Sequence, residues 1–417
     1  MTAAADTERA YQAGRGETGS ERKVLGLENS PLSDFLGFEL LLSDQDRELL
    51  SSVRAFMTRE VEPVINDYWT RAAFPHELLP GIAKLGIAGL AYDGPGCPYR
   101  GALVDGMVAM ELGRVDPSMA TFMGVHGGLA MGSINLCGSD EQRERWLPPM
   151  ARMELIGAFG LTEPDVGSAI SAGLTTSARR AGDEWVLNGE KKWIGNAAFA
   201  DLIVIWARDE QDGQVKGFVV EKGTDGMTFD KQEDKIALRV VQNAEIHLHD
   251  VRVPEANRLQ KAESFRSTAD VLRVTRMSVA WQAAGCARGA YEHALRYTKA
   301  REQFGRPIAS FQMVQDLLVK MLSNVTASTA MNVRASQLQD AGLLKDEHAS
   351  LCKAHATVRM REAVGWAREV LGGNGILLEH HVGRFVADAE AIYSYEGTRE
   401  INTLIVGRAI TGESAFV

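Results

Sequence analysis

Apolar residues recur at helical spacing through the first third of the chain, from about residue 43 to residue 155. Asp44–Val61 repeats them every three or four positions, which predicts an amphipathic helix. Met119–Met131 is largely apolar, so we expect its methionines to fill a core. Ser139 precedes Asp-Glu-Gln-Arg, a sequence typical of a helix start, and its hydroxyl is expected to cap that helix.

The pattern changes to short β-rich runs between about residues 157 and 259. Such runs occur at Glu184–Leu187, Leu202–Trp206 and Gly217–Val220. Asn188-Gly189 and Gln211–Gln214 separate them and are typical of tight turns. This stretch therefore predicts a domain built from short strands.

One strand is predicted with particular clarity at Ala244–Asp250, where apolar and polar residues alternate strictly. His247 and His249 share one face of this strand and could be imagined as metal ligands. No third ligand accompanies them, so we interpret this as an exposed strand face.

Helical spacing returns from about residue 264 to residue 410, in long segments broken near Arg306-Pro307, Gly342 and Gly372-Gly373. The expected fold class is α+β, with a central β-barrel or sandwich between helical regions. The predicted divisions are a flexible N-terminal arm (1–37), an N-terminal helical domain (38–156), a central β domain (157–263) and a C-terminal four-helix bundle (264–417).

Composition and short motifs argue against several classes of protein. The net charge of −10 argues against a nucleic-acid binder. Four widely spaced cysteines without a CxxC pair are typical of a reduced intracellular protein. With no membrane-length apolar run and no signal peptide, a cytoplasmic location is expected. GxxxxGK[ST] does not occur, and the one GxGxxG match, Gly14–Gly19, lies in the expected N-terminal arm with no β-rich run before it, so neither the P-loop nor the dinucleotide-fold signature is present in its structural context.

The tripeptide Tyr395-Glu396-Gly397 is the strongest candidate for chemistry. Burial of a carboxyl group beside an aromatic ring raises its pKa toward working pH, as a base that removes a carbon-bound proton requires. The glycine lets a substrate approach the backbone closely. On its own, an acid near a helix start is also a favourable partner for the helix dipole.

Four sequence blocks must be explained together with this carboxyl group. They are Phe159–Ser168, a turn-rich loop; Lys191–Asn196, which is expected to follow a hairpin turn; Arg301–Pro307 with Phe311-Gln312; and Leu371–Gly375 with the Tyr-Glu-Gly-Thr segment. Individually each is explained by a turn or a cap. In this order and spacing, from about Phe38 to the C-terminus, they resemble the acyl-CoA dehydrogenase superfamily.

The finer resemblance is to the glutaryl-CoA dehydrogenase branch and to plant short-chain acyl-CoA oxidases. Val240–Asn243 and the ending Gly407–Gly412 carry it. The resemblance implies an FAD enzyme that converts an acyl-CoA thioester to the trans-2-enoyl-CoA. Glu396 matches the base that removes the α proton, while the β hydrogen leaves as hydride to flavin N5. The backbone N–H of this glutamate and a ribityl hydroxyl would polarise the thioester oxygen.

The resemblance also implies binding residues. Those expected to contact the flavin ring and its surroundings are Phe159, Leu161, Thr162, Ser168, Trp193, Ile194 and Gly195. Those expected to hold the pyrophosphate and adenine, partly from a neighbouring subunit, are Arg301, Gln303, Phe304, Gln312, Glu369, Val370, Leu371, Gly372, Gly373, Thr398 and Glu400. Phe416 matches an aromatic residue near the flavin, and the expected substrate contacts are Ser168, Arg276, Tyr395 and Gly397. Apart from the resemblance, a surface salt bridge is the preferred interpretation of Arg276.

Three departures from the family pattern bear on specificity. In the glutaryl branch an arginine binds the distal carboxylate, but the matching residue here is Ala120, and a nearby branch glutamate is Gly113. An unpaired buried carboxylate costs several kcal/mol, so an uncharged short or medium acyl chain is expected. Gly195 replaces the threonine usual in dehydrogenases and would open space beside the flavin for oxygen. Ala169 replaces a common aspartate after Gly-Ser, which puts the details of the CoA end in doubt.

Several functions therefore stay open. The leading expectation is a homotetrameric acyl-CoA dehydrogenase that passes electrons to an electron-transfer flavoprotein. The enzymatic alternatives are an acyl-CoA oxidase that uses O2 and a decarboxylating glutaryl-CoA dehydrogenase. The non-enzymatic alternative is a catalytically silent flavin- or acyl-CoA-binding scaffold, against which the presence of Glu396 argues.

Overall fold

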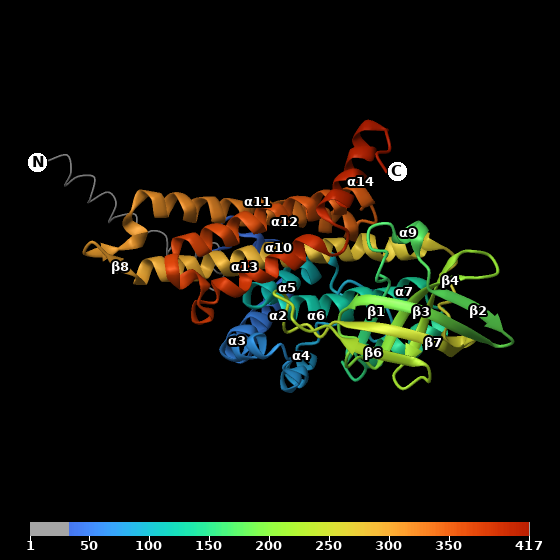
Figure 1. Cartoon of the computed structure of the whole chain (residues 1–417). Helices are drawn as coiled ribbons and strands as arrows, with labels where there is room; N and C mark the ends of the chain where they lie inside the picture. The colour runs from blue at the N-terminus through green and yellow to red at the C-terminus, as the bar shows by residue number, and fades with distance from the viewer. Residues whose placement is uncertain (1–32, 417) are drawn as a thin grey trace, which may run out of the picture.

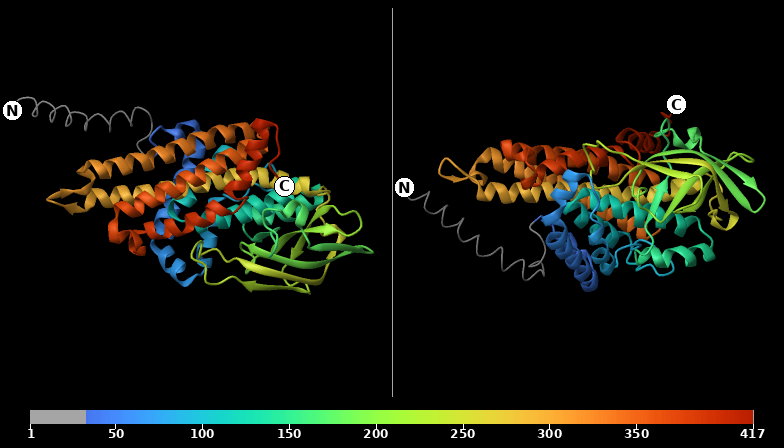
Figure 2. Two further views of the ribbon diagram at one scale, coloured as in Figure 1. Left: turned by 45° about the horizontal axis from the view of Figure 1, so that its top comes forward. Right: turned by 60° about the horizontal axis from the view of Figure 1, so that its bottom comes forward.

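The computed structural model describes residues 33–416. Figure 1 shows an elongated bundle of long helices, with shorter N-terminal helices beneath its middle and a β-sheet domain at one end. The views in Figure 2 place this sheet beside the end of the bundle that carries the C-terminus. The predicted α+β class, with helices, then strands, then a helical bundle, is confirmed.

The N-terminal part is helical because its apolar positions keep the helical period. Ser43 caps the first long helix, accepting a hydrogen bond from the Asp46 N–H at 3.2 Å. The predicted cap at Ser139 is also present, as a reciprocal capping box with Gln142. The elements are η1 (Phe38–Leu41), α2 (Asp44–Phe56), η2 (Met57–Val61), α3 (Glu62–Arg71), η3 (His76–Leu78), α4 (Leu79–Leu85), α5 (Ala102–Val115), α6 (Pro117–Met123), η4 (Gly124–Ala130), α7 (Met131–Cys137) and α8 (Asp140–Ala151).

The central part is one seven-stranded sheet of order β1-β4-β2-β3-β7-β6, in which β5 also pairs with β4. β1 and β2 run parallel to β4, and the other pairs are antiparallel. The elements are β1 (Gly157–Gly160), α9 (Ile170–Gly173), β2 (Ser177–Ala181), β3 (Glu184–Ile194), β4 (Leu202–Asp209), β5 (Val215–Glu221), β6 (Met227–Lys231), β7 (Ala244–Pro254) and η5 (Glu255–Asn257).

One predicted turn is wrong. Asn188-Gly189 does not end a strand, because β3 runs through it without interruption. Gly189 has φ 142°, and the pairing of β3 with β7 shifts register between Leu187 and Gly189. An irregular step of this kind is a β-bulge, for which glycine is well suited. The Lys191–Asn196 block therefore ends a long bulged strand and does not follow a hairpin turn.

The C-terminal part is a bundle in which α10, α11 and α12 pack along one another and α13 and α14 cover α12. Gly289 of α10 lets α5 approach closely, because a Cβ atom there would lie 2.0 Å from the Arg114 carbonyl oxygen. The elements are α10 (Phe265–Ala300), β8 (Glu302–Gln303), β9 (Arg306–Pro307), η6 (Ile308–Ser310), α11 (Gln312–Asp340), α12 (Asp346–Val370), η7 (Gly372–Ile376), η8 (Leu378–His380), α13 (Val382–Ser394) and α14 (Arg399–Thr411).

Buried charges join the N-terminal helices to the bundle. Glu111 of α5 is fully buried and pairs with Arg54, Arg114 and Arg288. These cations hold the pKa of Glu111 well below its usual range despite the cost of burial. Arg384 of α13 forms a second fully buried pair with Asp116, which also caps α6.

The folded body includes Ser33 and Asp34, which lie inside the segment expected as an arm. Ser33 and Asp34 are both buried, and Ser33 accepts a hydrogen bond from Arg288 at 2.7 Å. The rest of that segment, 1–32, lies outside the described residues. Between residues 33 and 416, no helix combines the length and the apolarity needed to cross a lipid bilayer.

Candidate active site

Glu396 lies in the short loop between α13 and α14, with unusual backbone angles. Its φ is 57° and that of Gly397 is 81°, so two consecutive residues are left-handed. This conformation is energetically unfavourable for a non-glycine residue, so it occurs only where the surrounding structure enforces it. Thr398 ends the loop by capping α14, accepting a hydrogen bond from the Ile401 N–H at 3.2 Å. Such strain is typical of a functional loop.

Two buried side chains hold the loop by its carbonyl groups. The ammonium group of Lys353, on α12, donates to the Gly397 carbonyl at 2.7 Å and to the Tyr393 carbonyl at 3.0 Å. Asn402 also donates to the Gly397 carbonyl, at 2.9 Å. Lys353 and Asn402 are both fully buried, so these bonds are shielded from water.

The carboxyl group of Glu396 is enclosed near one hydroxyl group and two cations. Burial raises its pKa above the usual value, and the hydrogen bond from Thr275, together with the charges of Arg276 and Lys353, offsets part of that rise. Arg276 itself is half-buried, and its Nε is buried without a hydrogen-bond partner among the described residues. The surface salt bridge considered for Arg276 is therefore not what the structure shows.

The side chain of Tyr395 lies against helices α6 and α10. Its hydroxyl donates to Gln282 of α10 at 2.9 Å and lies 3.2 Å from the Thr121 hydroxyl of α6. Burial raises the pKa of this phenol. The tyrosine thus fixes the loop against α6 and α10 and stays neutral.

On the sheet side, the loop after β1 is anchored by a buried ion pair. Lys191 of β3 donates to Glu163 at 2.9 Å and to the Leu161 carbonyl at 3.1 Å. Glu163 also accepts hydrogen bonds from the backbone N–H groups of Thr175 and Thr176. Burial lowers the pKa of Lys191 to about 8. Burial also raises the pKa of Glu163, but the charge of Lys191 and the hydrogen-bond donors outweigh this effect and lower it to about 2.

This anchored loop presents groups suited to a bound aromatic cofactor. Phe159 and Leu161 are buried, whereas Thr162 is half-buried and Ser168 is exposed. The hydroxyls of Thr162 and Ser168 make no hydrogen bond to the described residues. Trp193 is 57 % exposed and left-handed, with φ 65°. An exposed indole and free hydroxyls are the kinds of group that a flavin ring with a polar edge requires.

Helix α6 and its continuation η4 connect this surface to Glu396. Asn196 donates to the Phe122 carbonyl at 3.2 Å, while the neighbouring Thr121 contacts Tyr395. A Cβ atom on Gly195 would lie 3.0 Å from a methyl group of Val125. Val125 therefore fills part of the space that Gly195 was expected to open for oxygen.

The N-terminal, middle and C-terminal domains of acyl-CoA dehydrogenase match residues 43–154, 158–251 and 265–411. The chain belongs to the acyl-CoA dehydrogenase family. It is thus an oxidoreductase that acts on the CH–CH bond of acyl-CoA, with FAD as cofactor.

Similar proteins span nearly its whole length. An acyl-CoA dehydrogenase of Bacillus subtilis is 32% identical and aligns with 86% of this chain and 96% of its own. A glutaryl-CoA dehydrogenase of Mycobacterium smegmatis in complex with FADH2 is 34% identical, with TM-score 0.89 over 92% of this chain and 98% of its own. Butyryl-CoA dehydrogenase of Megasphaera elsdenii is 30% identical, with TM-score 0.84 over 88% and 98% of the two chains.

Within this acyl-CoA dehydrogenase chain, the residues expected to hold the adenosine diphosphate fall into two groups. Arg301, Gln303, Phe304 and Gln312 lie at the β8 end of the bundle (Figure 1). The stretch 369–373 lies at the same end, because the next residue, Asn374, donates to Tyr297 of α10 at 2.9 Å. Thr398 and Glu400 begin α14, at the opposite end, with Glu396.

These two groups of residues lie far apart in one chain. Arg276 and Arg301 are 25 positions apart along and just beyond α10, which corresponds to ~38 Å of helix. One chain therefore cannot bring both groups to one cofactor. Phe304 is 93 % exposed at that far end, and Phe416 is 40 % exposed beside Arg408 of α14.

Three residues that contact the loop of Glu396 are not indicated by any sequence motif. Thr275 and Gln282 lie within α10, and Lys353 lies within α12, at least 43 positions before Glu396. Each is a polar residue inside a helical pattern, where a solvent-facing position is the usual expectation. Only Lys353 carried a weak signal, because it lies among the small and apolar residues Cys352, Ala354 and Ala356.

Proposed function

We propose that this enzyme oxidises the α,β bond of short or medium-chain, uncharged acyl-CoA thioesters, with Glu396 as the base that removes the α proton. The observation that carries the proposal is the environment of Glu396: a half-buried carboxyl group with a raised pKa, on a strained loop held by Lys353 and Thr275. A raised pKa makes the carboxylate a better proton acceptor near neutral pH.

The surrounding residues suit the two states of that base. Arg276 and Lys353 attract the ionised form, so enough carboxylate is available to accept a proton. Burial favours the neutral acid formed once the proton has moved. FAD, when bound, supplies the acceptor for the β hydride. The left-handed backbone of Glu396 and Gly397 is expected to direct the Glu396 N–H toward the thioester oxygen, where it stabilises the enolate-like charge.

The cofactor is expected to lie between the sheet domain and the loop. Phe159, Leu161, Thr162, Trp193, Ile194 and Gly195 would contact the flavin, and Ser168, Arg276, Tyr395 and Gly397 the substrate. The two segments at the β8 end, 301–312 and 369–373, would reach the FAD of a second chain, because in their own chain they lie far from Glu396. Exposed Phe304 and Met313 at that end support a homotetramer, the assembly that we propose.

An uncharged acyl chain is favoured by Ala120. It is 1 % exposed on α6 and carries no charge where the resemblance places a carboxylate-binding arginine. We propose an electron-transfer flavoprotein as acceptor. Direct reaction with O2 is the second candidate, favoured by Gly195 and weakened by the methyl group of Val125 beside it.

An anaerobic titration of the yellow protein with butyryl-, octanoyl-, isobutyryl- and glutaryl-CoA tests the proposal. Bleaching by the neutral thioesters with slow recovery in air is expected. Rapid recovery with peroxide release would identify an oxidase, and bleaching by glutaryl-CoA alone would refute the proposed substrate class. No bleaching by any thioester would refute the dehydrogenation itself.

A further inference from the structure

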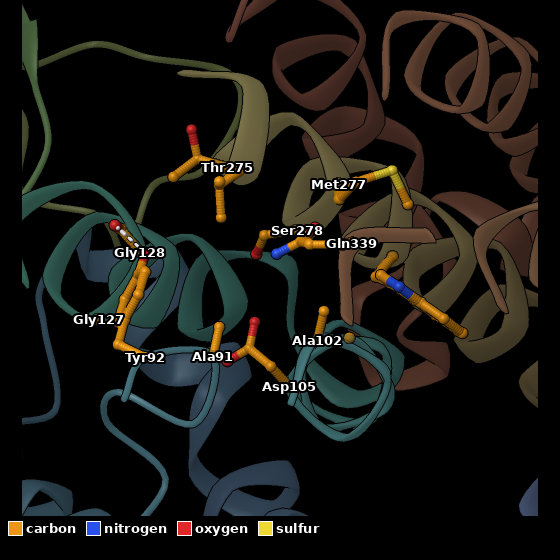
Figure 3. Close-up of a pocket in the computed structure, with 13 residues that line it drawn as sticks. Ala91, Tyr92, Ala102, Asp105, Gly127, Gly128, Thr275, Met277, Ser278 and Gln339 are labelled. Carbon is orange, nitrogen blue, oxygen red and sulfur yellow. Dashed lines mark hydrogen bonds between the residues drawn. The ribbon is translucent and has the colours of Figure 1, made fainter. Parts of the chain in front are cut away.

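The pocket enclosed by α5, η4, α10 and α11 is too small for a ligand (Figure 3). Asp105, Thr275, Ser278 and Gln339 are among the residues that line it. Its volume is about 20 Å³, which is room for one water molecule. No group of a substrate or a cofactor fits there. The buried charge of Lys191, on the sheet side of the proposed active site, is a better candidate for an unassigned role.

Lys191 is a fully buried lysine within strand β3. Its ammonium group donates to the Leu161 carbonyl at 3.1 Å and to Glu163 at 2.9 Å. Burial lowers its pKa to about 8, so the group is still mainly charged at pH 7. A neutral donor would anchor the same loop with a smaller desolvation cost. The retained charge therefore indicates a second role.

The Lys191–Glu163 pair is a dipole with its positive end at the loop after β1. Glu163 accepts three further hydrogen bonds, from the Thr175 N–H at 2.7 Å, the Thr175 hydroxyl at 2.6 Å and the Thr176 N–H at 2.8 Å. Part of the Glu163 charge is offset by these donors. The ammonium group of Lys191 is therefore left to polarise the Leu161 carbonyl that it contacts.

The peptide bond between Leu161 and Thr162 links this polarisation to the cofactor side of the loop. The described residues contain no cis peptide bond, so the Thr162 N–H points away from the Leu161 carbonyl and from Lys191. This N–H donates to none of the described residues, and the Thr162 carbonyl is fixed by the Lys192 N–H at 2.8 Å. A hydrogen bond to the carbonyl of a peptide strengthens its N–H as a donor. A fixed, polarised donor is thus free to bind the polar edge of a flavin.

We infer that Lys191 raises the reduction potential of bound FAD through the Leu161–Thr162 peptide. This inference rests on the proposed function, in which Leu161 and Thr162 contact the flavin. The thioester supplies the two electrons as a hydride, and Glu396 takes the α proton. Reduction adds negative charge to the polar edge of the flavin, so a polarised N–H at that edge stabilises the reduced state more than the oxidised state. Lys191 is a positioning residue, because it acts through a peptide that it holds.

Reduction potentials test this inference without any thioester. The FAD-loaded protein is reduced with dithionite at pH 7 in the presence of a reference dye. Lys191→Gln keeps a hydrogen-bond donor and removes the charge, so the equilibrium constant for two-electron reduction should fall about tenfold, a shift of about −30 mV. Lys191→Met also removes the donor and should in addition raise the dissociation constant of FAD. Lys192→Met is the matched control: this side chain is 31 % exposed on the other face of β3, and its loss should leave the potential unchanged.

A double variant separates the charge of Lys191 from that of Glu163. Without Lys191, the Glu163 carboxylate is left buried with neutral donors alone, which would lower both the potential and the stability. Lys191→Gln combined with Glu163→Gln leaves neither charge, so this variant should fold even where the single variant does not. It should keep at least about half of the shift in potential, because the Leu161 carbonyl has lost its charged donor.

The potentials distinguish this inference from the proposed function. A wild-type potential in Lys191→Gln, or full recovery of the wild-type potential in the double variant, would overturn the role of Lys191. A lowered potential in both, with Lys192→Met unchanged, would support it. If no thioester reduces the wild-type flavin, the proposed function fails, while the potentials still decide the role of Lys191 because they need no thioester.

Discussion

Replacing Lys353 by Met should slow flavin reduction and move its pH dependence to higher pH. Lys353 is fully buried, and its ammonium group is the only charged donor to the carbonyls on either side of Glu396 among the described residues. Methionine has a similar length and no charge, so it removes these bonds with little change in packing.

The magnitude follows from two separate effects. Each hydrogen bond from a charged donor contributes about 1.5–3 kcal/mol, and two are lost, at 2.7 and 3.0 Å. Asn402 still donates to the Gly397 carbonyl, so the loop is loosened without being released. The second effect is electrostatic. Without the cation, the pKa of Glu396 rises further, because the charge of Lys353 lowers it in the wild type.

The direction of the pH effect is fixed by the role of Glu396 as a base. Only the ionised carboxylate accepts a proton, so activity is present above its pKa and is lost as the pH falls through it. A higher pKa moves that acid limb of the profile upward. Stopped-flow measurements of flavin reduction between pH 6 and pH 8 should show this shift in the limiting rate constant. The affinity for the thioester should change less.

Lys235 provides a matched control. Burial lowers its pKa to about 8, like that of Lys353, and it donates to the carbonyls of Leu238 and Val241 and to Asn243. Lys235→Met should lower stability but keep the pH profile. An unchanged profile and rate in Lys353→Met, or the same shift in both variants, would refute the reasoning.

Four further outcomes are expected. Glu396→Gln should retain FAD and acyl-CoA binding yet reduce flavin about 10³-fold more slowly; a near-normal rate would remove Glu396 as the base. Arg301→Ala should lower FAD content and tetramer stability on gel filtration, and full retention would contradict a role across an interface. Glu111→Gln should lower the free energy of unfolding in urea by about 3–5 kcal/mol, because it leaves three arginines without their shared partner; a loss below about 1 kcal/mol would count against this. Burial lowers the pKa of His126 from 6.5 to about 4. As the pH falls from 6.5 to about 4, the unfolded chain binds a proton at this histidine before the folded chain does, so the free energy of unfolding falls by up to about 3 kcal/mol. His126→Gln should flatten this part of the pH profile of stability measured in urea.

Local patterns predicted much of the fold. Strict alternation at Ala244–Asp250 marks β7, whose side chains alternate between buried and half-buried from Ala244 to Leu248. The Ser139 cap and the apolar Met119–Met131 segment are also as expected. Asn188-Gly189 misled because the same dipeptide suits a hairpin turn and a β-bulge, and pairing with β7 selected the bulge.

The sequence by itself determined the order of helices and strands, the family, and Glu396 as the candidate base, because these depend on short-range periodicity and on motifs within a few residues. Only the tertiary structure decided what surrounds that base. Thr275 bonds the Glu396 carboxyl group and Lys353 bonds the neighbouring Gly397 carbonyl, each from a helix distant in the chain. Their polarity has no local signature, since burial and pKa depend on which helices pack together. For the same reason, only the packing shows that Arg301 and Glu396 lie at opposite ends of one bundle.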